Sequence, residues 1–157
     1  MKRILKFIVA MSVMTFAVAA PVFAALPTPE QLLVMEAKNA EKIYAELDDL
    51  IVKANGNPDG PQWSGHRKLV ANNIAKFNLD TNQKYMQQMQ IRVGASMEVE
   101  RVKLEQLNNC KSLAALNPAY AAMVPQALAE YQQAVANTQA ARAEVIHAAT
   151  VLGVPVQ

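Results

Sequence analysis

Cysteine, histidine and glycine are scarce in this sequence, and their scarcity excludes several classes of site. The 157 residues include one cysteine, two histidines and five glycines. The single Cys110 cannot form a disulfide within the chain, and His66 and His147 are far apart in sequence. The sequence contains no HExxH, GxSxG, Cys/His cluster or glycine-rich phosphate loop. We therefore expect a protein that is not an enzyme and that holds no metal or other cofactor.

A basic surface is also missing once the N-terminal segment is set aside. The full sequence has 15 Lys and Arg against 13 Asp and Glu, a net charge of +2. Three of the basic residues lie within residues 1–24, so residues 25–157 have a net charge of −1. Nucleic acids and anionic lipid surfaces are recognised by patches of Lys and Arg. We therefore expect neither as a partner.

Residues 1–24 have the three parts of a Sec-type signal peptide. Three basic residues begin the segment: Lys2, Arg3 and Lys6. An uncharged apolar run follows, and Val22-Phe23-Ala24 offers small residues before a cleavage point. The alternative is an uncleaved anchor, but Pro21 interrupts the run where a membrane span would continue. We expect cleavage, export to the bacterial periplasm or medium, and no stable membrane insertion afterwards.

The remaining residues, 25–157, are expected to form a single all-α domain. In residues 28–56 the apolar positions recur in steps of three and four: Leu33, Ala37, Ala40, Tyr44, Leu47, Ile51 and Ala54. This spacing predicts one apolar stripe on a helix. Thr28 and Gln31 are placed for a capping box, Pro29 suits the first helical position, and Asn55-Gly56 suits a left-handed stop.

Three further helices are expected, at residues 64–78, 81–116 and 124–152. Val70, Ile74 and Phe77 share one face of the first, and Asp80 or Thr81 is placed to cap the second. In the last helix alanine recurs every seven residues, at Ala127, Ala134, Ala141 and Ala148. Such small residues permit close approach of a neighbouring helix. Together the elements predict an up-down bundle of about four helices.

Residues 89–99 have a second interpretation, because apolar and polar residues alternate there, as in a strand. We favour a helix, since the flanks are helical and the rest of residues 25–157 holds no convincing strand to pair with. As a helix, residues 81–116 have two apolar stripes. Met89 lies on one stripe and Ile91 lies nearly opposite on the other.

A helix with two apolar stripes either lies centrally or meets another molecule with one of them. The residues that we expect to contact a partner protein, or a second copy of the chain, are Met89, Ile91, Ala95, Val99 and Val102. Cys110 is either a buried small hydrophobic residue or half of an intermolecular disulfide.

The leading hypothesis is an exported, non-catalytic helical protein that binds another protein. Chaperone-like, secretion-accessory, inhibitor and immunity roles all fit it. The alternative is a periplasmic four-helix bundle that carries haem or a metal, with Met35 and His147 as the ligands. At about 100° per residue, both residues lie on sides of their helices away from the apolar seams. We therefore expect them to point away from the core.

Overall fold

The computed structural model describes residues 26–156, and the predicted signal peptide at residues 1–24 lies outside this range. Every regular element of the described residues is helical, which confirms the all-α expectation. The three α-helices are α2 (Pro29–Lys53), α3 (Ser64–Leu116) and α4 (Val124–Leu152). Short 3₁₀ helices, η1 (Pro61–Trp63) and η2 (Pro118–Met123), precede α3 and α4.

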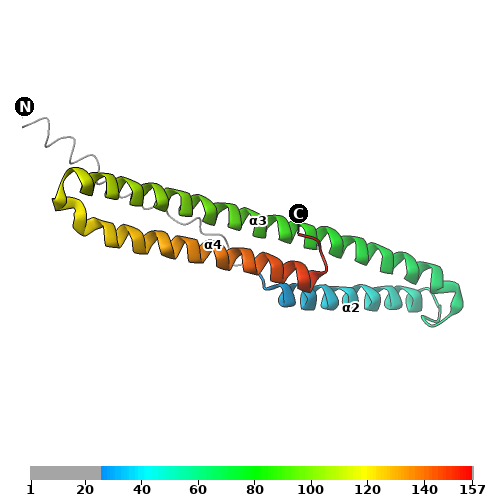
Figure 1. The fold of residues 1–157 in the computed structure, drawn as a ribbon. Coiled ribbons are helices and arrows are strands. Elements are labelled where there is room, and N and C mark those ends of the chain that lie inside the picture. Colours follow the sequence, from blue (N-terminus) through cyan, green and yellow to red (C-terminus); the bar gives the residue numbers. More distant parts are fainter. Residues whose placement is uncertain (1–25, 157) are drawn as a thin grey trace, which may run out of the picture.

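The long helix α3 is the axis on which the other two helices lie (Figure 1). At 1.5 Å per residue its 53 residues span about 80 Å. After η2 the chain turns back, and α4 runs antiparallel along the second half of α3. The helix α2 runs antiparallel along the first half, so α2 and α4 follow each other end to end. The described residues therefore form a rod two helices thick.

The continuity of α3 contradicts the predicted break between residues 78 and 81. Asp80 and Thr81 were expected to cap a new helix, but both lie inside α3. The hydroxyl of Thr81 donates to the carbonyl oxygen of Phe77 at 2.9 Å, so it is satisfied within the helix. Asp and Thr cost only about 0.6 kcal/mol more than Ala in a helix interior, and no Gly or Pro is present there. Within residues 26–156 three α-helices are observed in place of about four.

The remaining predictions for α3 concern residues 89–99, which the structure places in the middle of the helix. The favoured helical interpretation is confirmed, and the strand alternative is wrong. The apolar residues of the alternating pattern therefore lie on two sides of one helix.

The ends of α2 follow the predicted chemistry. The hydroxyl of Thr28 accepts from the backbone N–H of Gln31, and the Gln31 side chain accepts from the backbone N–H of Thr28. Asn55 adopts the left-handed conformation, with φ of 56°, just after the helix. The predicted seam is shifted, however, because Leu32 is buried whereas Leu33 is exposed. Both positions are apolar, so packing against α3 and α4 decides which one faces inward.

Among the described residues the contact between α3 and α4 is the most extensive. Ala134 and Ala148 of the predicted alanine repeat are buried, and the side chain of Ala148 has no exposed surface. Between them Thr138 is buried, with its hydroxyl donating to the carbonyl oxygen of Ala134 at 3.1 Å. Lys103 and Glu130 form an ion pair of 2.7 Å at one edge of this seam. The expectation that the alanine face is an interhelical contact is confirmed.

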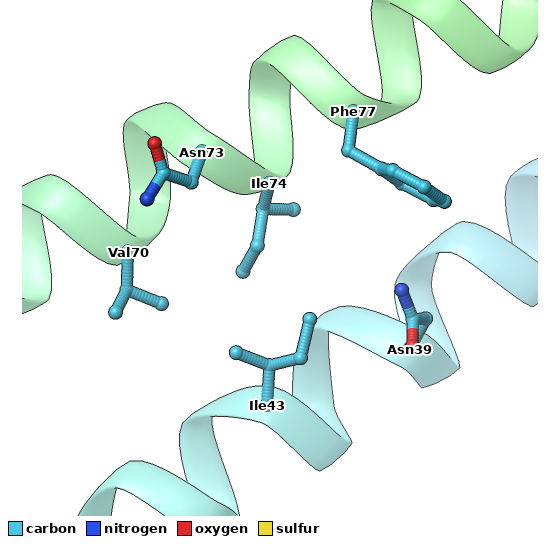
Figure 2. A pocket seen from close by; sticks show the side chains of 6 residues that line it. All are labelled: Asn39, Ile43, Val70, Asn73, Ile74 and Phe77. Carbon is cyan, nitrogen blue, oxygen red and sulfur yellow. The ribbon is translucent and has the colours of Figure 1, made fainter.

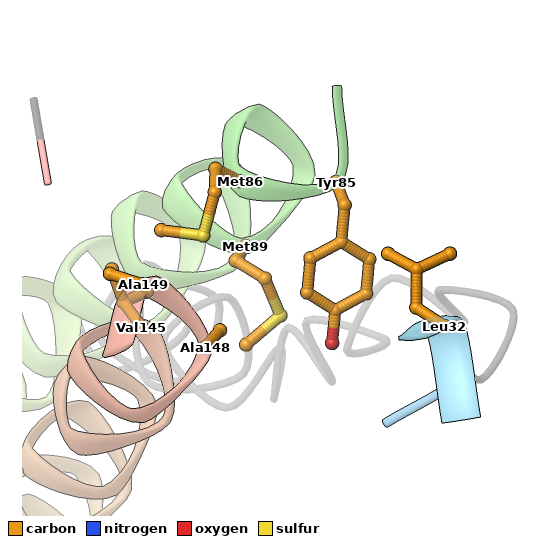
Figure 3. Close-up of a cluster of buried hydrophobic side chains, with 7 residues drawn as sticks. All are labelled: Leu32, Tyr85, Met86, Met89, Val145, Ala148 and Ala149. Atoms are coloured by element: carbon orange, nitrogen blue, oxygen red, sulfur yellow. The ribbon is translucent and has the colours of Figure 1, made fainter. Parts of the chain in front are cut away.

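All three helices meet in one apolar cluster at the middle of α3 (Figure 3). Its buried members are Leu32 from α2, Tyr85, Met86 and Met89 from α3, and Val145, Ala148 and Ala149 from α4. The phenol of Tyr85 donates to the carbonyl oxygen of Pro27 at 2.9 Å. Glu30 and His147 form a hydrogen bond of 2.7 Å between the first turn of α2 and the last turns of α4. These contacts fix where α2 begins relative to where α4 ends.

Across residues 26–156 the structure holds no helix with the length and apolarity needed to cross a membrane.

The alanine seam generates a stability prediction for Ala148→Leu. The added side chain has no space between α3 and α4, so we expect it to lower the free energy of unfolding by about 1–3 kcal/mol. Ala143→Leu, on the exposed side of the same helix, is the matched control and should change it by less than about 0.5 kcal/mol. Chemical denaturation followed by circular dichroism measures both. Equal effects of the two substitutions would contradict the close packing of α3 and α4.

Candidate partner-binding surface

A groove separates α2 from the first half of α3 (Figure 2). It has a volume of about 330 Å³. Its lining consists of Asn39 and Ile43 from α2 and Val70, Asn73, Ile74 and Phe77 from α3. Four of these six side chains are apolar, and the two asparagines supply the polar groups. We refer to this feature as the α2–α3 groove.

The groove exists because medium-sized and polar side chains hold α2 and α3 apart. Ile43 and Ile74 point toward each other across it and are half-buried (Figure 2). Phe77 extends along the groove and remains 59% exposed. The sequence grouped Val70, Ile74 and Phe77 correctly on one face but did not show that this face stays partly open. The feature that marks the opening is Phe77 itself, which is unusually exposed for a Phe and lies between Asn73 and Asn78 on the helix.

The turn between α2 and α3 lies beyond one end of the groove. Arg67 forms an ion pair with Asp48 of α2 and donates to the carbonyl oxygen of Pro58 at 3.2 Å. Trp63 packs near Gly56, where a Cβ atom would come within 3.0 Å of the indole ring. The indole also makes an edge contact with His66, with 5.4 Å between ring centroids. This end of α2 is therefore anchored, as the cluster at Tyr85 anchors the other end.

Between the groove and the cluster at Tyr85, α2 contacts α3 through polar side chains. Glu36 of α2 lies against Asn82 of α3, and Asn78 lies one turn before Asn82. One oxygen of each of these three side chains is buried and has no hydrogen-bond partner among the described residues. Burial raises the pKa of Glu36, and its hydrogen bond with Asn82 lowers the pKa by less. Buried polar groups with incomplete hydrogen bonding weaken a contact, so this part of α2 is held less firmly than α4.

Opposite charges on α2 and on the first half of α3 offset part of the weakness of their contact. Acidic residues predominate on α2: Glu30, Glu36, Glu41, Glu46, Asp48 and Asp49, against Lys38, Lys42 and Lys53. Basic residues predominate on the first half of α3: Arg67, Lys68, Lys76 and Lys84, against Asp80. Opposite charge along two neighbouring helices favours their association and sets their pairing.

The five residues predicted to contact a partner do not share one surface. Met89 is only 5% exposed, because α4 and the first turn of α2 cover it. Ile91 is 59% exposed, and Ala95, Val99 and Val102 are half-buried. Since two residues turn a helix by about 200°, Met89 and Ile91 point in directions about 160° apart. The expectation for Met89 is therefore wrong in this fold, whereas the other four residues line an uncovered side of α3.

The line of this uncovered side leads into the groove, where Val70 and Phe77 face α2. Phe77, Ala95 and Leu113 are separated by steps of 18 residues, which is five helical turns, so they lie in one line along α3. Ile91 and Val102 lie within about 40° of that line. We refer to this side of the helix, from Val70 to Leu113, as the α3 side face.

The groups that could hold a cofactor are on the surface. Met35 is 58% exposed, and His147 is exposed and paired with Glu30. The expectation that both point away from the core is confirmed, whereas buried haem needs ligands that face inward. Within residues 26–156 no group of three or more His, Cys, Asp or Glu side chains is arranged to hold a metal ion. Cys110 is a free, half-buried thiol.

Comparisons of the chain with protein-family models, with curated proteins and with solved structures found no match. Function is therefore inferred from the residues of this chain and their geometry.

Glu36 generates a pH-dependent prediction. Because its pKa is raised in the folded state, its contribution to stability is full below the ordinary pKa of a glutamate and is lost as the pH rises through the raised value. We expect Glu36→Gln to raise the melting temperature at pH 7 and to leave it nearly unchanged at pH 4. Differential scanning calorimetry at the two pH values measures this. Glu41→Gln, on the exposed side of α2, is the control, and an equal gain at both pH values would contradict the assignment.

Proposed function

We propose that this protein is exported and acts, without catalysis, by binding another protein in the α2–α3 groove. The observation that carries the proposal is the groove itself, an apolar channel of about 330 Å³ between two helices. Exposed apolar surface of this kind, rimmed by polar groups, is typical of a binding site. Export is supported by the three-part pattern of residues 1–24.

The shape of the groove favours an apolar segment of the partner, such as one face of an amphipathic helix. Two parallel walls supplied by α2 and α3 accept side chains between them, in the manner of helix-in-groove recognition. Ile43, Ile74 and Phe77 offer apolar contact, while the amides of Asn39 and Asn73 can donate to and accept from the partner backbone. Chaperone-like, secretion-accessory, inhibitor and immunity roles all use such contacts.

The contacts of the two histidines and of Glu36 support the proposal that the protein acts without catalysis. His66 contacts Trp63, and His147 is paired with Glu30 at the opposite end of α2. Neither histidine lines the groove. Glu36 faces Asn82 across the α2–α3 contact. Burial in this contact explains why the pKa of Glu36 is raised.

A photocrosslinking amino acid tests the proposal in the native cell. With p-benzoylphenylalanine in place of Asn39 we expect a discrete adduct whose added mass is that of a second protein species. The same residue in place of Lys38, which is exposed outside the groove lining, is the control and should give no such adduct. Ile74→Glu in the Asn39 crosslinking variant should abolish the adduct, because it puts a charge inside the groove.

Two results would overturn the proposal. Adducts of equal yield at positions 38 and 39 would show that contact is unrelated to the groove. An adduct at position 39 with twice the mass of this chain would show that the occupant is a second copy and not another protein. Circular dichroism of Ile74→Glu must show native helicity for the comparison to count.

A further inference from the structure

The end of the rod where α3 turns into α4 carries no charge. Residues 112–129 comprise the last turn of α3, all of η2 and the first turns of α4, and they contain no Asp, Glu, Lys or Arg. This run of 18 residues is the longest without charge in residues 25–157. Turns in contact with water are typically built from Gly, Asn, Asp and Ser, whereas alanine and leucine predominate here. We refer to residues 112–129 as the hairpin tip.

Several apolar side chains of the hairpin tip lie outside the packed contact of α3 with α4. Leu116 is 84% exposed, more than any other large hydrophobic residue that the structure describes. Leu113, Met123 and Leu128 are exposed as well. The tip lies at the end of α3 farthest from α2, and within residues 26–156 it contacts only its own hairpin (Figure 1). Apolar surface gathered at one end of a molecule indicates contact with an apolar partner outside the chain.

Charged residues resume at nearly the same depth on the two helices of the tip. On α3 the nearest is Lys111, five residues before Leu116, and on α4 it is Glu130, six residues after Val124. At 1.5 Å per residue these distances are about 8 Å and about 9 Å. Protein elements that bind the surface of a lipid bilayer bury their apolar groups about 5–10 Å into the boundary between headgroups and acyl chains. The charge-free depth of the tip therefore matches a bilayer surface.

The backbone of the hairpin tip is suited to an apolar medium, because its polar groups bond to one another. The N–H of Tyr120 donates to the carbonyl oxygen of Asn117 at 3.0 Å, and the side-chain oxygen of Asn117 accepts from the N–H of Ala119 at 3.0 Å. Pro118 and Pro125 occupy the first turns of η2 and α4, where a backbone N–H would have no partner within the helix. These features lower the free energy needed to remove the backbone from water.

We propose that the hairpin tip docks onto the surface of a lipid bilayer and inserts Leu113, Leu116 and Met123 among the headgroups. The end of a hairpin is convex, and acyl chains adapt to a convex shape, whereas a protein partner needs a matching hollow. The contact is peripheral and reversible, and apolar burial drives it, so it needs neither a spanning helix nor a basic patch. The inference goes beyond the proposed function and does not depend on it, because the tip and the α2–α3 groove share no residue.

A fluorophore at the tip tests the contact locally. In the full chain, exported and purified from the cell envelope, Cys110 is replaced by serine and Met123→Cys carries an environment-sensitive nitrobenzoxadiazole label. Vesicles of phosphatidylcholine should shift its emission to shorter wavelength, and spin-labelled acyl chains should quench it. The same label on Lys68→Cys, at the opposite end of α3, is the control and should show neither effect.

A charge at the tip tests whether apolar burial drives the contact. In the protein labelled at position 123, Leu116→Glu should weaken vesicle binding roughly tenfold, because burial of a leucine side chain is worth at least that factor. Ile146→Glu is the matched control, since Ile146 is 62% exposed on α4 and lies 22 residues, about 33 Å, beyond Val124. It should leave binding unchanged. Both variants change exposed residues, so circular dichroism should show native helicity.

Three results would overturn the proposal. Emission at position 123 that does not respond to vesicles would show that the tip does not enter lipid, and would point to a protein as its partner. Equal weakening by Leu116→Glu and Ile146→Glu would show that the contact is not made at the tip. Binding only to vesicles that contain anionic phosphatidylglycerol would show that charge, and not apolar burial, drives it. The crosslinking result at Asn39 is independent of all three, because that residue lies on α2.

Discussion

The apolar cluster at the middle of α3 determines the shape of the molecule. Tyr85, Met86 and Met89 are covered at once by the start of α2 and the end of α4. Because both helices use the same short stretch of α3, neither can extend across it, and they lie end to end (Figure 1). The hydrogen bond from Tyr85 to Pro27 and the hydrogen bond between Glu30 and His147 hold the two ends at this point. A rod two helices thick follows, and one side of α3 is left uncovered.

The two halves of the rod are packed with different side chains, and this difference explains why the groove lies between α2 and α3. Alanines at every seventh position bring α4 close to α3, so that half is closed. Along α2 the facing positions are Glu36, Asn39 and Ile43, which meet asparagines and β-branched residues on α3. Around them the contact holds an unfilled groove and polar oxygens without hydrogen-bond partners among the described residues. The α2–α3 contact is therefore held at its ends and by charge, and it is open between them.

The sequence was informative where a local rule decides the outcome. The Thr28–Gln31 capping box, the left-handed stop at Asn55 and the buried alanines of α4 were predictable for that reason. The break at residues 79–81 was predicted wrongly, because Asp and Thr are acceptable both as caps and inside a helix, and tertiary packing selects between these uses. The burial of Met89 was missed for a related reason. Helical phase separates Met89 from Ile91, but it does not say which of the two sides another helix will cover.

The central claim is that α3 is one continuous helix along which α2 and α4 are arranged. Double electron–electron resonance tests it most directly, with spin labels in place of the exposed Lys68 and Lys111, Cys110 replaced by serine, and excess unlabelled chain to dilute contacts between copies. A continuous α3 predicts a label separation of about 65 Å, from 43 residues at 1.5 Å each. A separation below about 40 Å would mean that the chain folds back near residue 80, as in a compact four-helix bundle, and would contradict the account.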